Sequence, residues 1–402
     1  MFDVIVIGKG MMGAAAARYL SAAGQQVALL GPDEPQDWRS HDGVFSSHYD
    51  EGRITRILDA DPVWARLAAD SLAVYGEIEQ RSGIAFHHAV GGLRGSAVAG
   101  ERGEPLIAQI EAVGRSLGAP FTRETGASVM EKRPFFHFPA NTPLLWETGG
   151  AGYVNPRALV AAQVAVAQQQ GAKVVRETAV SLHQVSDGIT VTTDSGQMLQ
   201  GRKVLVAAGA FSNMVVPQVA ERPLAIYRKA HMVLLAELNA AEQARLTGMP
   251  TLIYLLPPGE SVPNIYMLPP VRYPDGRTYV KLGGGTHWPE RIFANWDEIR
   301  DWFQSDGDPR EGEVLREALH YLLPGLQAQS YHTKPCILAY TAHERPYIDQ
   351  IGERLYVVAG GCGSAAKSSD AIGHLGALLA LGQPWPEGYE RADFRAVFAD
   401  EV

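Results

Sequence analysis

The chain has little cysteine and no long apolar run. Two cysteines, Cys336 and Cys362, are too few for a disulfide framework or a cysteine-rich metal site, and so few thiols suit a reducing compartment. No uninterrupted apolar stretch reaches the roughly 18 residues of a membrane-spanning helix. Glycines interrupt the apolar run at the N-terminus, so we expect no signal peptide, no membrane span and a cytoplasmic protein.

The sequence also lacks a basic tract. It has 35 Lys and Arg against 44 Asp and Glu, a formal net charge of −9, which argues against nucleic acid and anionic membranes as partners. Its 12 histidines show no H-x-H or H-E-x-x-H spacing, so no metal site is predicted. What remains is an ordinary globular composition, 46% hydrophobic and 20% charged, in a chain of 402 residues that is long enough for two domains.

The N-terminal stretch has the pattern of a dinucleotide-binding unit. Phe2–Val6 and Val27–Leu30 are short apolar runs typical of strands, and a helix is predicted between them over Ala14–Ala23. A G-x-G-x-x-G turn over Gly8–Gly13 joins the first strand to this helix. In this context the glycines indicate a phosphate site, in which the unpaired N–H groups of the helix N-terminus hold a diphosphate.

Each glycine of the turn has its own task. Gly8 allows the tight turn, Gly10 lets the backbone approach the diphosphate, and Gly13 lets helix and strand pack closely. Met12 lies inside the same turn and is also expected to contact the cofactor.

The end of the second strand departs from the usual pattern. An acidic residue normally stands there to accept the ribose hydroxyls, but this chain has Gly31, followed by Pro32 and Asp33. Either Asp33 reaches back to the ribose or the ribose is held in another way. No arginine lies next to Gly31 to take a 2′-phosphate, so NADP is not supported.

The remaining chain predicts a mixed α/β protein of two domains. Residues 1–85, 149–218 and 332–402 are expected to form a Rossmann-like dinucleotide-binding domain, because strands there alternate with helices. Residues 86–148 and 219–331 are expected to form a discontinuous substrate domain built on an antiparallel sheet. Its strands are predicted over Tyr227–Leu235, Thr251–Leu256, Asn264–Leu268 and Thr278–Leu282.

Several segments form a pattern together. Ser47–Arg56 reads S-H-x-x-[DE]-x-R-I-x-R, and Cys336 precedes Asp349 by thirteen residues. The other segments of the pattern are Gly8–Gly13, Val204–Phe211, Tyr279–Gly283 and Gly360–Ser369. With these segments the chain resembles the FAD-dependent amine oxidases of the monomeric sarcosine oxidase and N-methyltryptophan oxidase type, in the D-amino-acid-oxidase-like superfamily. The resemblance implies that the cofactor is FAD.

The resemblance also implies a role for individual residues. Cys336 matches the cysteine that carries the flavin through an 8α-thioether, and Lys281 matches the lysine over the flavin face where oxygen is activated. Arg56 and Lys367 match the pair that binds the substrate carboxylate, and Arg53 matches an arginine near the flavin edge. The further cofactor contacts implied are Ser47, Gly361 and Gly363.

Some positions depart from the family. Leu338 stands where related enzymes tend to have tyrosine, two residues after the flavin-bearing cysteine, and Tyr340 follows two positions later. Tyr49 replaces a second histidine, and Gly31 replaces the usual acid. These changes bear on the substrate more than on the reaction.

The charged residues and the cysteine named above also have simpler structural explanations. Arg53 and Arg56 are predicted on one face of a helix over Glu51–Leu58, where they could pair with nearby acids such as Asp59. Lys281 could be a lysine on an edge strand that prevents the strand from pairing with another chain. Similarly, Lys367 could be a surface lysine, and Cys336 a small buried hydrophobe.

The predicted function is oxidation of an amino acid or an N-substituted amino acid. A hydride equivalent passes from the carbon next to nitrogen to the flavin, the imine product hydrolyses, and oxygen is reduced to hydrogen peroxide near Lys281. A flavin dehydrogenase with a quinone or protein acceptor, a NAD-linked dehydrogenase and a non-catalytic binding protein remain as alternatives. The sequence does not identify the amine or the oligomeric state.

Overall fold

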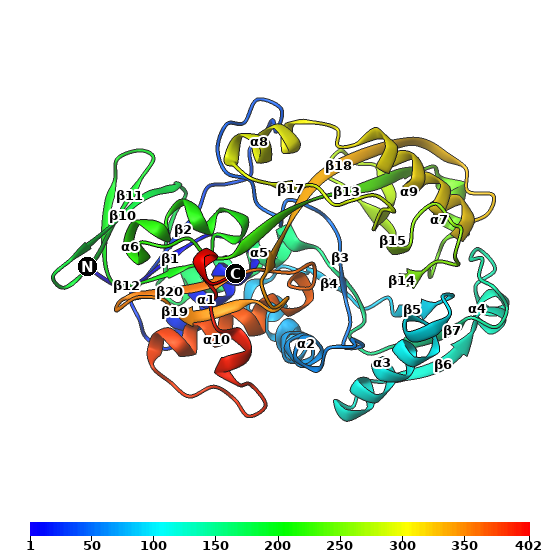
Figure 1. Ribbon diagram of the computed structural model, residues 1–402, viewed down its shortest axis with the longest axis horizontal. Helices are drawn as coiled ribbons and strands as arrows, with labels where there is room; N and C mark the ends of the chain where they lie inside the picture. The colour runs from blue at the N-terminus through cyan, green and yellow to red at the C-terminus, as the bar shows by residue number, and fades with distance from the viewer.

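The N-terminal strand lies in the middle of an eight-stranded sheet (Figure 1). In the computed structural model, which describes residues 1–402, β1 (Phe2–Ile7) pairs in parallel with β2 (Val27–Leu30) and β12 (Met198–Val206). β12 also pairs in parallel with β20 (Leu355–Ala359). The other strands are β9 (Lys173–Val175), β10 (Ala179–Val185), β11 (Gly188–Thr193) and β19 (Tyr347–Gln350). The predicted Rossmann-like sheet is therefore confirmed.

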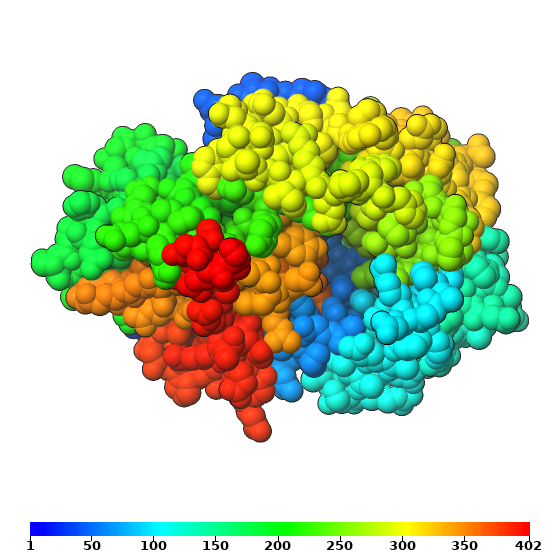
Figure 2. All heavy atoms as spheres, in the orientation of Figure 1, coloured from blue at the N-terminus to red at the C-terminus, as the bar shows by residue number.

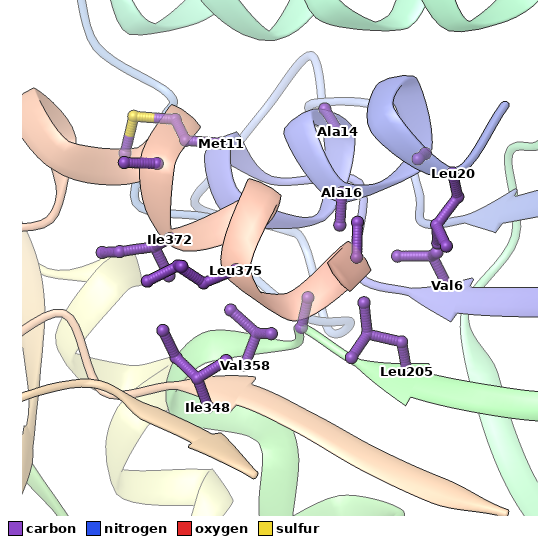
Figure 3. Packing of buried hydrophobic residues seen from close by; sticks show 14 of the residues in the cluster. Val6, Met11, Ala14, Ala16, Leu20, Leu205, Ile348, Val358, Ile372 and Leu375 are labelled. Atoms are coloured by element: carbon purple, nitrogen blue, oxygen red, sulfur yellow. The ribbon is translucent and has the colours of Figure 1, made fainter. Parts of the chain in front are cut away.

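Small residues let three helices pack closely against this sheet. α1 (Met11–Ala22) lies against α5 (Pro156–Gln169) and α10 (Ser369–Leu381). Figure 3 shows Met11, Ala14, Ala16 and Leu20 of α1 packed with Ile372 and Leu375 of α10, above strand residues Leu205, Ile348 and Val358. A Cβ atom at Gly373 would lie 2.6 Å from the carbonyl oxygen of Met12, so this close approach needs glycine.

A second, nine-stranded sheet carries the other half of the molecule (Figure 1). Its long strands β13 (Ile226–Leu238) and β18 (Ala328–Thr341) pair antiparallel with each other, and β13 also pairs with β16 (Thr278–Gly284). The other strands are β5 (Gly92–Ser96), β6 (Phe121–Thr125), β7 (Pro143–Glu147), β14 (Thr251–Leu255), β15 (Asn264–Arg272) and β17 (Ile292–Phe293). α9 (Pro309–Leu322) packs Leu315 and Leu319 against this sheet. The predicted antiparallel sheet is confirmed.

Further helices complete the two halves. They are α2 (Pro62–Ser82), α3 (Glu104–Ser116), α4 (Gly126–Lys132), α6 (Pro217–Ala220), α7 (Ala240–Arg245) and α8 (Trp296–Gln304). No helix is both long enough and apolar enough to cross a membrane. We retain the division into a cofactor domain and a substrate domain as a proposal; β18 runs across its boundary at residue 332.

The predicted helix over Glu51–Leu58 is wrong. Arg53–Thr55 forms strand β3, which pairs antiparallel with β8 (Gly152–Val154), and β8 also pairs with β4 (His87–His88). Side chains alternate between the two faces of a strand, so residues three apart point in opposite directions. Arg53 and Arg56 therefore do not share a helix face. Arg53 pairs with Asp50 and Arg56 pairs with Asp59, so the two arginines belong to different clusters of charged residues.

A buried polar network joins the three helices of the first half. Asp370 of α10 accepts hydrogen bonds from Arg18 (2.7 Å) and Tyr19 (2.7 Å) of α1 and from Gln163 (2.6 Å) of α5. Asp370 is only 1% exposed and Arg18 is 5% exposed. The Asp370 carboxylate thus neutralises a guanidinium that water cannot reach.

The Asp370→Ala variant should lose about 3 kcal/mol or more of unfolding free energy, because the Arg18 charge would stay buried without a partner. Urea denaturation of this variant and of Asp187→Ala, which removes an exposed carboxylate, measures the difference. We expect the control to stay within about 0.5 kcal/mol of the natural protein. Equal stability of the two variants would contradict the role given to Asp370.

Candidate active site

A cavity of about 1170 Å³ runs between the two halves of the molecule. Its wall includes Gly8 and Gly10 of the glycine turn, and it also includes Arg53, Cys336 and Lys367. Figure 2 shows one face of the molecule hollowed near its centre, where N-terminal residues in blue lie beneath later parts of the chain. The cavity therefore joins the predicted phosphate site to the predicted substrate-binding residues.

The glycine turn has the shape that a diphosphate needs. Gly8 has φ of 114°, and a Cβ atom there would lie 2.2 Å from the carbonyl oxygen of Ala207. A Cβ atom at Gly13 would lie 1.9 Å from the Gly8 carbonyl oxygen. At Gly10, the N-cap of α1, no side chain caps the helix, so its first N–H groups are free to bind an anion.

Asp33 is not among the residues that line the cavity. Its side chain is 58% exposed and pairs with Lys9 and, at 3.2 Å, with Arg176. Gly31 does line the cavity, but a Cβ atom there would lie 2.6 Å from the backbone nitrogen of Lys9. Any side chain at position 31, acidic or not, would thus collide with the glycine turn.

The first charge cluster centres on Asp50, which is 2% exposed. Its Oδ2 accepts Lys281 Nζ at 2.5 Å and lies 2.6 Å from Arg53 Nη1. Its Oδ1 accepts Tyr273 Oη at 2.9 Å and the backbone N–H of Glu51. Asp50, Arg53 and Lys281 form what we call the Asp50 triad.

Lys281 lies in the interior of the second sheet. Its strand, β16, lies between β13 and β15, so the alternative of an edge-strand lysine is wrong. Lys281 is 0% exposed, and its ammonium donates to the Gly52 carbonyl oxygen as well as to Asp50. Arg53 lines the cavity, whereas Lys281 is absent from its lining.

Burial and neighbouring charges act on the pKa values of this triad. Burial and the charge of Arg53 lower the pKa of Lys281 to about 8, although Asp50 opposes that shift. Burial alone would raise the pKa of Asp50, but Lys281 and Arg53 hold it well below the usual range. Asp50 is therefore ionised at neutral pH, and the triad carries a net positive charge.

The second cluster, the Asp59 triad, has the same composition. Asp59 Oδ2 accepts Arg56 Nη2 at 3.0 Å and Lys367 Nζ at 2.8 Å, and Lys367 also donates to the Trp64 carbonyl oxygen. Lys367 is 1% exposed and lies in the short turn Ala366–Ser368 before α10. The alternative of a surface lysine is thus wrong, whereas the suggested ion pair between Arg56 and Asp59 is present.

The residues of the Asp59 triad lie on the walls of two adjacent cavities. Arg56 and Lys367 line the cavity, and Asp59 lines a smaller one beside it. Burial and the charge of Arg56 lower the pKa of Lys367 to about 8. Burial alone would raise the pKa of Asp59, but Lys367 and Arg56 hold it well below the usual range.

Both cysteines are buried free thiols on the cavity wall. Cys336 lies on β18 opposite His231 of β13, and its Sγ is 3.7 Å from Arg53 Nη2. Cys362 has φ of 46°, and burial raises the pKa of its thiol. The neighbours of the two thiols therefore differ, because Cys336 lies beside the Arg53 guanidinium whereas Cys362 Sγ lies 3.6 Å from the Thr341 hydroxyl.

The remaining predicted contacts also lie on the cavity wall. They are Met12, Ser47, Gly361 and Gly363. Leu338 and Tyr340, the two residues at the departure from the family pattern, line the cavity as well.

Sequence reasoning missed the acid at the centre of the first charge cluster. Asp50 received no role, although an acid three residues before Arg53 is itself a signal for an ion pair. Tyr266 and His231, joined by a hydrogen bond of 2.9 Å, also line the cavity. Burial and the charges of Arg53 and Lys281 lower the pKa of His231 to about 3, so its imidazole is neutral.

Comparison with known proteins decides the family. Residues 3–379 match the model of the DAO family, described as FAD dependent oxidoreductase. The chain belongs to this family. The resemblance inferred from the sequence is confirmed, and so is the expectation of a flavin-dependent oxidoreductase. The glycine turn fits the diphosphate of FAD, and the same cavity is lined by Cys336 and Arg53, which are predicted near the flavin.

Similar proteins include two named oxidases. The chain is 26% identical to monomeric sarcosine oxidase of Bacillus sp. (strain B-0618), with 94% of this chain and 92% of that enzyme covered. It is 26% identical to N-methyl-L-tryptophan oxidase of Citrobacter koseri over 56% of this chain and 57% of that enzyme. The fold resembles that of NikD, described as an unusual amino acid oxidase, with a TM-score of 0.77 and 20% identity over 99% of this chain and 98% of that chain.

The Gly13→Ala variant should bind FAD about ten- to a hundred-fold more weakly, because the new methyl group would push the Gly8 carbonyl out of the turn. Flavin absorbance of the purified variant, followed by titration with FAD, measures the loss. Gly76→Ala is the matched control, because no atom lies within 4 Å of a Cβ at Gly76 in α2. Full flavin content in the Gly13 variant would contradict the phosphate role of the turn.

Proposed function

We propose that the protein is an FAD-dependent oxidase of an amino acid or an N-substituted amino acid. The observation that carries this proposal is the pair formed by Arg56 and Lys367 on the wall of the large cavity. Both cations are tied to a single oxygen of Asp59. Two positive charges share one negative charge there, so the pair can still attract one carboxylate.

The carboxylate of the substrate binds to Arg56 and Lys367. An arginine offers parallel N–H donors to a carboxylate, and a buried ammonium adds charge with little competition from water. With its carboxylate fixed, the substrate presents its amine to the part of the cavity lined by Arg53, Tyr266 and Cys336. The amine binds in its neutral form.

Bound FAD would supply the acceptor for a hydride equivalent from the carbon next to the amine nitrogen. The chain contributes orientation and charge. Arg53 lies on the cavity wall with Lys281 behind it, and the two share Asp50. This net positive charge stabilises negative charge as oxygen is reduced.

A flavin dehydrogenase that uses a quinone or protein acceptor is a second candidate function. One observation favours it: the Lys281 ammonium points toward Asp50 and Gly52, and Lys281 does not line the cavity. An oxidase needs its cation close enough to act on oxygen. Oxygen and dye acceptors therefore have to be compared directly.

Anaerobic mixing of the FAD-loaded protein with single amino acids and N-methyl amino acids tests the function. We expect one class to bleach the flavin, and air then to restore its colour with release of hydrogen peroxide. Restoration by a dye but not by air would identify the dehydrogenase. Bleaching by none of these compounds would contradict both.

With the amino acid identified in this way, Arg56→Met should raise KM about a hundred-fold, because one of two donors to the carboxylate is lost. The KM for the substrate and the rate of flavin bleaching at saturation separate binding from chemistry. Arg102→Met, which removes an exposed arginine, is the control and should keep the natural KM. An unchanged KM in the Arg56 variant would contradict the proposal that Arg56 binds the substrate carboxylate.

We also propose that Cys336 carries the flavin covalently. Acid precipitation of the natural protein should then give a yellow pellet, and Cys336→Ala should release its FAD to the supernatant. Cys362→Ala is the matched control, since it removes the other thiol on the cavity wall. A colourless pellet from the natural protein would exclude the covalent bond, and release by the Cys362 variant alone would move it to that thiol.

A further inference from the structure

We infer that Asp50 is a positioning residue that holds Lys281 as a buried cation beside Arg53. The inference rests on the proposed function, because it assigns a task to Lys281 in the reaction with oxygen. Asp50 lies in the segment Ser47–Arg56, at a position that the family pattern leaves open. It is therefore a property of this chain that the resemblance does not supply.

Contacts on both oxygens fix the Asp50 carboxylate. Oδ1 accepts from Tyr273 Oη and from the Glu51 backbone N–H, and Oδ2 takes the two cations. The Asp50 side chain is 3% exposed, so it cannot exchange these partners for water. A carboxylate held in this way fixes the atoms that it binds.

Lys281 depends on that carboxylate for its charge. The ammonium is fully buried in the middle of a sheet, and its other hydrogen-bond partner is the neutral carbonyl group of Gly52. A buried lysine without an opposite charge loses its proton readily. Asp50 is the acid in contact with Lys281. The other titratable and charged groups around the two residues are Arg53, His231, Tyr266, Tyr273, Lys334 and Cys336.

The shared acid also keeps the two cations close together. Arg53 reaches the cavity wall, where it contacts the Ser47 carbonyl oxygen and lies near Cys336 Sγ. Asp50 draws Arg53 and Lys281 to the same oxygen atom. The lysine charge thus lies directly behind the guanidinium, although two like charges would otherwise separate.

The test uses FAD-loaded protein reduced with dithionite or light and then mixed with oxygen in a stopped-flow instrument, so no substrate has to be known. We expect Asp50→Asn to slow reoxidation at neutral pH about ten-fold or more, because a positive charge fixed where negative charge develops speeds its formation. Lys281 is charged below a pKa of about 8, so the natural rate should fall as pH rises through that value. In the variant the fall should begin at lower pH.

Four further variants test whether Asp50 acts through Lys281. Asp50→Glu should restore much of the rate, and Asp187→Asn, which changes an exposed acid, should have no effect. Lys281→Met should also slow reoxidation, and the double variant should be no slower than Lys281→Met alone, because the two residues act as one unit. Additive losses, or faster reoxidation in Asp50→Asn, would overturn the inference.

A second readout does not depend on flavin activity. NMR titration of the Lys281 side chain in FAD-free protein, assigned by its loss in Lys281→Met, should show the proton leaving at lower pH in Asp50→Asn than in the natural protein. Equal titration would overturn the inference even where amine oxidation is established. Failure of the proposed function would appear separately, as a natural protein that no amine bleaches.

Discussion

The structure depends on the neutralisation of buried cations by two carboxylates. Asp50 and Asp59 flank the short strand β3, and each holds one arginine from that segment and one lysine from a distant part of the chain. A buried charge without a partner is costly, so these elements cannot pack together unless the acids are in place. Each acid balances only one of its two cations, and the cavity wall therefore keeps a positive charge.

This arrangement links stability to chemistry. Lys281 belongs to β16 of the second sheet, and Lys367 belongs to the turn before α10 in the first half. Arg53 of β3 and Arg56, which follows β3, share an acid with one lysine each, and both arginines line the same cavity. The proposed substrate site thus lies at the junction of the two halves, which is where ligand pockets commonly form.

The glycine turn solves a separate problem at the other end of the cavity. A diphosphate needs unpaired N–H groups at close range, and the structure supplies them by excluding side chains at Gly8 and Gly13. The same crowding explains Gly31, because a side chain there would meet Lys9. The missing acid at the end of β2 is therefore a consequence of close packing around the turn.

The sequence by itself determined the N-terminal βαβ unit and the antiparallel strands, since both follow from local periodicity and glycine spacing. Through the resemblance to a known family it also singled out Arg56 and Lys367, which the structure places on the cavity wall. It did not determine that Arg53–Thr55 is a strand, because three residues pair with β8 across about a hundred positions of sequence. Only the tertiary structure decided which acid faces which cation: Asp50 meets Lys281 through pairing of distant elements, and burial then fixes their charges.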